Sequence, residues 1–248
     1  PESFEAEAVA RVIRLAEFAG TPLHIFHISC GAAVEEIAAA RSRGLSVTGE
    51  TCPQYLLLDE SVFDSTRGHD FATCPQIKTR DDSEALWKAL EAGSMSVIAT
   101  DTCTFRSSQK DLWRGDFRKI PFGLPGVETM VPLTFSAGPA SGRMSFNHWV
   151  RLLSENPAKV FGLYPRKGTI AIGSDADIVV WDDSHERLIS ATELQTYCDY
   201  SPYEGFRTKG WPKWVFSRGK LVAEEGKFVG EVGHGQYLER QPGESLTE

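Results

Sequence analysis

The sequence predicts an α/β protein in which strands of a parallel barrel are followed by a small antiparallel β unit. Three observations support this prediction. Helix-like and strand-like stretches alternate over residues 1–101, which is typical of βαβ units. Two apolar, strand-like runs in this part end abruptly in an ionisable side chain. After residue 168 the pattern changes to short strands separated by turns.

The first half of the chain supplies the alternation, because apolar residues recur at helical spacing in some stretches and run continuously in others. In order, the sequence predicts a helix over residues 3–19, a strand over 22–29, a helix over 31–41, a strand over 45–51, a long loop, a helix over 82–93 and a strand over 95–101. A closed barrel of this type has eight strands, and three are too few to close one. We therefore expect a piece cut from a longer barrel; the alternative is a small open α/β domain.

The second half of the chain reads differently. A helix is predicted over residues 146–161, with a break or a new helix start at Asn156–Pro157. The predicted strands that follow cover residues 169–172, 177–181, 213–216, 220–223 and 227–229. From Gly230 to the end no periodicity remains, so this tail is expected to be an extended arm or disordered.

Composition argues against several classes of function. The chain has 248 residues with 26 basic and 34 acidic side chains, and no Lys/Arg-rich stripe, so charge gives no support for a nucleic-acid partner. No apolar stretch approaches the roughly 20 residues that span a bilayer, and the first residues do not resemble a signal peptide. We therefore expect a cytoplasmic protein without a membrane partner. The five cysteines form no C-x-x-C pair and are predicted to be reduced core residues.

Asp101 is the leading candidate for chemistry. It follows the apolar run Val97–Ala99, and a buried, unpaired carboxylate there would cost several kcal/mol unless a cation or hydrogen-bond donors accompany it. His27 ends the preceding apolar strand in the same way. Parallel barrels keep their chemistry at the carboxyl ends of strands, and histidine and aspartate are metal-ligand types, so the pair predicts a metal-dependent hydrolase. A helix cap or a surface turn is the alternative for Asp101.

A second histidine, His24, lies three residues before His27. Side chains alternate along a strand, so only one of the two is expected to face the barrel interior. His27 is preferred because it is nearer the carboxyl end; a hydrogen-bonded core histidine is the alternative. Two ligands are too few for a catalytic zinc, which typically takes three from the protein. Other chemistries lack a motif, since G-x-S-x-G, the P-loop and G-x-G-x-x-G are missing.

Four longer motifs carry a resemblance to a known family. They are ETCPQYL at residues 50–56, GLPGVE at 123–128, NPAKVFGLYPRKG at 156–168 and GSDAD at 173–177. The sequence resembles the dihydropyrimidinase/hydantoinase family of cyclic amidohydrolases over almost its whole length. The resemblance implies the C-terminal part of a metal-dependent amidohydrolase (β/α)8 TIM barrel, strands six to eight, over residues 1–165. It further implies strands of a small β-sandwich domain over residues 166–230 and a C-terminal arm over residues 231–248.

The same resemblance implies an activity and its residues. Family members open the cyclic amide bond of dihydropyrimidines or 5-substituted hydantoins with two divalent metal ions, usually zinc, bridged by a carboxylated lysine that lies outside this chain. His27 matches the metal ligand on the sixth barrel strand, and Asp101 matches the metal ligand and catalytic proton shuttle on the eighth. Cys74 and Phe122 stand at substrate-binding positions, where the family more often has serine and asparagine and uses mainly backbone groups. The expected partners are a small cyclic ureide or imide and further copies of the protein in a homotetramer.

Two alternatives remain open at this point. The family includes non-catalytic structural or signalling relatives that have lost the metal ligands, and the presence of both His27 and Asp101 argues against that class. An allantoinase-type hydrolase is the other alternative, although the segments at Cys74–Pro75 and 156–159 are closer to dihydropyrimidinases. Because most family ligands lie outside this sequence, the chain alone is expected to be inactive.

Overall fold

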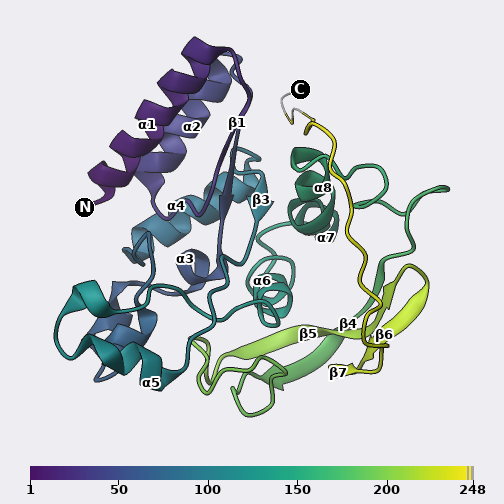
Figure 1. Ribbon diagram of the computed structural model, residues 1–248. Coiled ribbons are helices and arrows are strands. Elements are labelled where there is room, and N and C mark those ends of the chain that lie inside the picture. Colours follow the sequence, from purple (N-terminus) through teal and green to yellow (C-terminus); the bar gives the residue numbers. More distant parts are fainter. Residues whose placement is uncertain (245, 247–248) are drawn as a thin grey trace. The chain divides into compact units, whose positions relative to one another are not determined.

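The computed structural model describes residues 1–244 and 246, and the contacts among them divide the chain into two compact units (Figure 1). Unit 1 comprises Pro1–Met130 and Ile189–Phe206. Unit 2 comprises Val131–Leu188 and the described chain from Arg207 onwards. The segment 189–206 therefore leaves unit 2 between two of its strands and packs with unit 1. The domain boundaries given above remain a prediction.

Unit 1 contains a parallel sheet, which confirms the predicted α/β class. Within the described residues its strands follow the order β1 (Leu23–Ile25), β2 (Val47–Thr51) and β3 (Val97–Ile98). Every residue of β2 and β3 is buried. Backbone hydrogen bonds continue past the strand ends, from Ile28 N to Glu50 O at 2.8 Å and from Ala99 N to Thr51 O at 2.9 Å. The carboxyl ends of β1 and β3 therefore stay close to the middle strand.

Helices follow the strands in unit 1, and α1 and α2 lie side by side (Figure 1). The helices are α1 (Glu2–Ala19), α2 (Gly31–Ser42), α3 (Pro53–Leu57), α4 (Arg80–Glu91) and α5 (Ser107–Lys110), with short 3-10 helices η1 (Glu60–Asp64), η2 (Gly68–Phe71), η3 (Asp111–Trp113) and η4 (Phe117–Lys119). The three helices predicted here are confirmed to within two residues. Thr79 and Asp82 form a capping box that starts α4 earlier than periodicity indicated. The predicted long loop contains α3, η1 and η2.

The core of unit 1 is formed by apolar side chains of the helices that pack against the parallel sheet. Ile37 of α2 and both Leu86 and Leu90 of α4 are fully buried. Trp87 is 2% exposed and donates its indole N–H to Leu56 O at 3.0 Å. Burial of each such side chain stabilises the folded state by about 1.5–3 kcal/mol. The edge of the sheet therefore belongs to a well-packed core.

Unit 2 combines helices with an antiparallel sheet. Its elements are α6 (Met130–Ala137), α7 (Phe146–Val150), a π-helical turn η5 (Arg151–Glu155), α8 (Asn156–Val160), β4 (Ile178–Leu188), β5 (Arg207–Ser217), β6 (Lys220–Glu224) and β7 (Lys227–Phe228). The helix predicted over residues 146–161 is confirmed, since the chain is helical from Phe146 to Val160; at Asn156 a π-helical turn gives way to α8 without a break. The strand predicted over residues 169–172 is wrong, because these residues form turns and irregular structure. Ile170 and Ile172 are almost fully exposed, so no partner strand covers their alternating side chains.

The last three strands of unit 2 are joined by tight hairpins. Arg218–Gly219 connects β5 to β6, and Glu225–Gly226 connects β6 to β7. All four residues have positive φ, as the two-residue turns of antiparallel hairpins require. Beside the sheet, the rings of Phe135 and Trp181 lie 5.1 Å apart and belong to an aromatic cluster. These local features account for the antiparallel part of the fold.

The tail after β7 forms neither helix nor strand over residues 231–244. It is held by backbone hydrogen bonds from Gln241 N to Gly162 O at 3.0 Å and from Glu244 N to Lys159 O at 2.9 Å. The predicted arm at 231–248 includes residues 245, 247 and 248, which lie outside the described residues.

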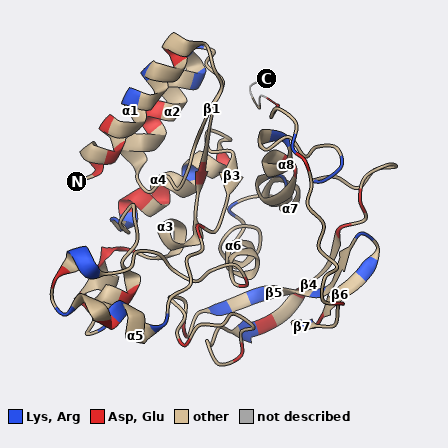
Figure 2. Cartoon of the chain, viewed as in Figure 1, with Lys and Arg blue, Asp and Glu red and all other residues tan. Residues whose placement is uncertain are grey.

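Charges of both signs are distributed along the chain, as Figure 2 shows for α1. In this helix Glu7 and Arg11 form an exposed ion pair at 3.5 Å. In the part of the chain that the structure describes, no helix combines the length and the apolar character that a membrane crossing demands.

Candidate active site

The carboxyl edge of the parallel sheet brings His27 and Asp101 together. His27 lies two residues beyond β1, and Asp101 lies three residues beyond β3. The two side chains interact electrostatically. His27 is half-buried, whereas Asp101 is exposed. The expectation of a buried carboxylate is therefore wrong for this chain, and the cost of burial does not by itself demand a cation at Asp101.

The backbone at both residues is unusual. The φ angle is 44° at His27 and 46° at Asp101, in the left-handed region that non-glycine residues rarely adopt. Within residues 1–244 and 246, the other non-glycine residues with positive φ are Arg114, Arg218 and Glu225, and each directly precedes a glycine in a turn. His27 and Asp101 precede isoleucine and threonine instead. Such conformations cost about 1–3 kcal/mol and are typical of functional sites. We therefore infer that the strained backbone is retained because it orients the two side chains.

Neither side chain has a hydrogen-bond partner among the described residues. Partial burial raises the pKa of the Asp101 carboxyl; His27 opposes this shift and Glu50 adds to it. An imidazole and a carboxylate without internal partners are the donor types that bind zinc and similar divalent ions, so the residues present fit a metal. No group of three or more histidine, cysteine or acidic side chains in the described chain is arranged to hold one. His27 and Asp101 are therefore at most part of a ligand set.

A buried polar row lies next to this edge. His24 contacts Thr48 Oγ1 through Nδ1 at 2.8 Å and Glu50 Oε2 through Nε2 at 3.1 Å. Glu50 is only 6% exposed and interacts electrostatically with Asp101. His24 is thus a hydrogen-bonded core histidine. Alternation of side chains along a strand does not explain why His24 and His27 differ, because β1 ends at Ile25. His27 lies beyond the strand, and its positive φ breaks the alternation.

Cys74 and Phe122 lie on two loops that are hydrogen-bonded to each other, the 72–75 loop and the 120–124 loop. Both side chains are exposed, and Cys74 is joined to Pro75 by a cis peptide bond. Gly123 N donates to Ala72 O at 2.9 Å. Gly123 has a φ of 125°, and a Cβ there would lie 2.2 Å from the Cβ of Cys103, so only glycine fits.

The 120–124 loop also contacts the segment that follows Asp101. Cys103 N donates to Leu124 O at 3.0 Å, and Thr102 pairs with Leu124 as an isolated parallel bridge. The two loops predicted to bind substrate are thereby connected to the chain that carries the candidate catalytic carboxylate.

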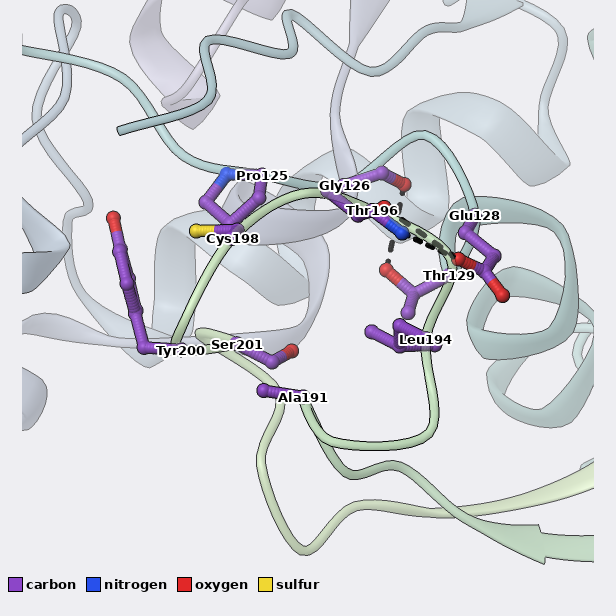
Figure 3. Close-up of a pocket in the computed structure, with 10 residues that line it drawn as sticks. All are labelled: Pro125, Gly126, Glu128, Thr129, Ala191, Leu194, Thr196, Cys198, Tyr200 and Ser201. Atoms are coloured by element: carbon purple, nitrogen blue, oxygen red, sulfur yellow. Dashed lines mark hydrogen bonds between the residues drawn. The ribbon is translucent and has the colours of Figure 1, made fainter. Parts of the chain in front are cut away.

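A small cavity elsewhere in unit 1 lies apart from His27 and Asp101. It is lined by residues 125–129 and by the segment 189–206 (Figure 3), and it has room for about one water molecule. Glu128 accepts hydrogen bonds there from Gln195 N at 2.7 Å and Thr196 N at 3.2 Å. Neither His27 nor Asp101 lines it. The contacts fasten the segment 189–206 to unit 1.

Sequence reasoning missed a second network, which holds the segment after His27. Glu5 of α1 accepts hydrogen bonds from Ser29 N at 2.8 Å and from Lys78 Nζ at 2.7 Å. These residues are far apart in sequence, and nothing in their local patterns links them. The network fixes Ser29 only two residues from His27.

The prediction of reduced core cysteines is correct for two positions and wrong for two. All five cysteines are free thiols. Cys30 and Cys52 are buried, whereas Cys74 and Cys103 are exposed. The exposed pair lies on or beside the two loops just described, where the chain turns away from the core.

Comparison with known proteins agrees with this geometry. The model of the amidohydrolase family matches residues 4–222. The D-hydantoinase of Geobacillus stearothermophilus is 44% identical over 243 residues, which cover 97% of this chain and 52% of that protein. The chain thus spans about half the length of the curated relatives it matches.

Solved structures give the same result. The dihydropyrimidinase from Brevibacillus agri NCHU1002 superposes with a TM-score of 0.96 at 41% identity, covering 98% of this chain and 53% of that one. The L-hydantoinase from Arthrobacter aurescens superposes with a TM-score of 0.91 at 33% identity, covering 97% and 53%. These matches confirm the resemblance drawn from the motifs. Because the family match extends over most of the sequence, the chain belongs to the amidohydrolase family.

Proposed function

We propose that the whole protein hydrolyses the cyclic amide bond of dihydropyrimidines or 5-substituted hydantoins, and that this chain is its C-terminal portion. The observation that carries the proposal is the pair His27 and Asp101, held together at the carboxyl edge of the sheet without hydrogen-bond partners among the described residues. The relatives support it, since similar proteins are named D-hydantoinase, D-phenylhydantoinase or dihydropyrimidinase.

The family is metal-dependent in general, and two divalent ions, zinc in our proposal, would be held in part by the His27 imidazole and the Asp101 carboxylate. The remaining ligands, including a carboxylated lysine, would come from outside this chain. When bound, such ions polarise the scissile carbonyl and make a water molecule nucleophilic near neutral pH.

The chain's own residues then have distinct tasks. The Asp101 carboxylate accepts the proton of the attacking water and returns it to the leaving ring nitrogen, and its exposed oxygens are open to both groups. General base catalysis of this kind typically contributes about 10²–10⁴-fold in rate. The peptide groups at Cys74 and Phe122 pair with the amide of the substrate ring. Their exposure at the surface of the two loops permits this contact.

The wider assignments follow from the same proposal. The substrate class is a small cyclic ureide or imide, the assembly is a homotetramer, and the protein acts in the cytoplasm. Light scattering on the purified whole protein tests the assembly directly, and a monomer in solution would contradict it.

One experiment tests the central claim. The whole protein is purified, its bound metals are measured by mass spectrometry, and ring opening is followed with dihydrouracil, a 5-substituted hydantoin and allantoin. We expect bound divalent metal and hydrolysis of dihydrouracil or the hydantoin, and no activity of residues 1–248 alone. Preference for allantoin would favour the allantoinase class. A folded protein with neither metal nor hydrolysis would place it among the non-catalytic relatives and overturn the proposal.

A further inference from the structure

Lys110 connects the two loops proposed to bind substrate. Its side chain, at the end of α5, is completely buried. The ammonium nitrogen donates to three backbone carbonyls, Ala72 O at 3.1 Å, Pro121 O at 2.7 Å and Gly123 O at 2.8 Å. An ammonium group has three N–H donors and no acceptor, so each donor has one carbonyl.

This arrangement is costly and therefore informative. Lysine is almost never fully buried without a paired charge, and in the described chain Lys110 forms no ion pair. Burial lowers its pKa to about 8, while Asp70, Cys103 and Cys198 oppose that shift. The ring of Phe105 lies 5.6 Å from the nitrogen. The ammonium is thus retained inside unit 1 with backbone carbonyls as its hydrogen-bond partners.

The three acceptors explain what the ammonium does. One carbonyl belongs to the 72–75 loop, and the other two flank Phe122 in the 120–124 loop. Carbonyl oxygens that converge on one point repel one another unless a donor lies between them. Apart from Lys110, one hydrogen bond links these loops within the described residues, from Gly123 N to Ala72 O. The spacing of the loops therefore depends on Lys110.

We propose that Lys110 is a positioning residue for substrate binding, which holds the peptide groups of Cys74 and Phe122 at the spacing that the ring amide requires. The inference rests on the proposed function. Lys110 lies beneath the loops and does not touch substrate. A displacement of binding groups by about 1 Å can cost about 100-fold in rate, so loss of the ammonium should have a large effect on substrate use.

The test uses the whole, metal-loaded protein with Lys110→Met, which keeps the length of the side chain and removes its donors. Lys119→Met is the matched control, because Lys119 of η4 belongs to the same region but its side chain is 66% exposed. We expect Lys110→Met to raise KM about tenfold and to lower kcat/KM about 10–100-fold, with bound metal unchanged. The Gly123 amide should also exchange with solvent faster than in the wild type. Lys119→Met should change none of these.

The outcomes separate the inference from the proposed function. A wild type that opens no ring overturns the function, whereas Gly123 exchange still tests the connection between the loops. An active wild type with KM within about twofold in Lys110→Met, or Gly123 exchange equal in both proteins, overturns the inference. Should Lys110→Met fail to fold, Lys110→Gln decides, since its shorter side chain has only two N–H donors and cannot serve all three carbonyls. A raised KM in folded Lys110→Gln supports the inference, and an unchanged KM refutes it.

Discussion

The parallel sheet of unit 1 and the antiparallel sheet of unit 2 each pair a glutamate with a nitrogen-bearing side chain of the neighbouring strand, but in opposite environments. Glu50 of β2 is 6% exposed and contacts His24 of the neighbouring strand at 3.1 Å. Glu186 of β4 and Arg207 of β5 are 3.8 Å apart, with side chains 60% and 74% exposed. Exposed pairs contribute little to stability, so the pair in unit 2 belongs to the solvated surface. A buried pair has to be retained against its desolvation cost, and it lies beside the candidate active site.

The strand ends show the same contrast. The left-handed residues of unit 2, Arg218 and Glu225, each precede a glycine and complete a hairpin turn. The left-handed residues of the parallel sheet, His27 and Asp101, complete no such turn. The left-handed conformation thus reverses the direction of the chain in unit 2, whereas in unit 1 it orients the side chains of the candidate active site.

Substitution at the left-handed positions gives the largest expected difference between the sheets. Asp101→Asn in the whole protein should lower kcat about 10²–10⁴-fold, because the amide cannot accept the proton. Glu225→Asn should leave kcat unchanged, since asparagine before glycine suits a hairpin turn. Both variants should melt near the wild-type temperature, because asparagine tolerates positive φ. Retention of more than about a tenth of kcat in Asp101→Asn would contradict the catalytic assignment.

Removal of the carboxylate from each pair tests stability in the same way. Glu50→Ala should lower the free energy of unfolding by about 1–3 kcal/mol, because it removes one of the hydrogen-bond partners of His24 inside unit 1. Glu186→Ala should change it by no more than about 0.5 kcal/mol. Urea unfolding of both variants measures the difference. Equal losses would show that the two sheets do not differ in this respect.

A smaller difference is expected from glycine substitutions. Gly123→Ala introduces a Cβ 2.2 Å from the Cβ of Cys103 at positive φ, which we expect to cost about 2–3 kcal/mol. Gly219→Ala meets nothing within 4 Å, so only its positive φ should matter, at about 1 kcal/mol. Thermal denaturation compares the two variants. A loss in Gly219→Ala as large as that in Gly123→Ala would show that close packing at Cys103 is unimportant.

The pH dependence of stability should have the same sign in both units but fall in different pH ranges, with the smallest effects. Burial lowers the pKa of Lys110 to about 8, against 10.5 in the unfolded chain, so the unfolded state binds more protons between these values and stability rises with pH there. Burial alone would raise the pKa of the Asp177 carboxyl, but Lys167 lowers it, and the net shift of this pKa is downward. Its stabilisation is present above the unfolded pKa of about 3.9 and is lost as pH falls through the lower folded value.

The free energy of unfolding, measured as a function of pH, checks both expectations. Lys110→Met should remove the rise between pH 8 and 10.5. Lys167→Met should reduce the loss below about pH 4. A rise that persists in Lys110→Met would assign it to another group.

The sequence predicted those parts of the fold whose signals are local. Helix α1 repeats its apolar residues over several turns, and His27 and Asp101 end continuous apolar runs, so both features could be found from spacing alone. Helix α3 was missed because it has only five residues, too few to show a period. The strand predicted over residues 169–172 failed because alternation does not reveal whether a partner strand exists.

Lys110 could not have been found in this way. Its acceptors are peptide carbonyls 38, 11 and 13 residues away, and every residue type has such a carbonyl. Contacts of this kind depend on the course of the chain and leave no mark on residue identity. The same holds for Glu5, which reaches Lys78 across 73 residues.

The path of the chain limits how this protein can be dissected. Residues 189–206 sit between β4 and β5 in sequence but pack with unit 1, where Tyr203 is 1% exposed and lies beside Cys52 and Tyr55. One cut in the chain therefore cannot separate the two units, since residues 1–206 contain the described segments of unit 1 but also residues 131–188 of unit 2. Expression of residues 1–130 by themselves would leave the space of Tyr203 empty beside α3. Insertion of a foreign sequence between β4 and β5 would likewise disturb the unit that carries the candidate catalytic carboxylate.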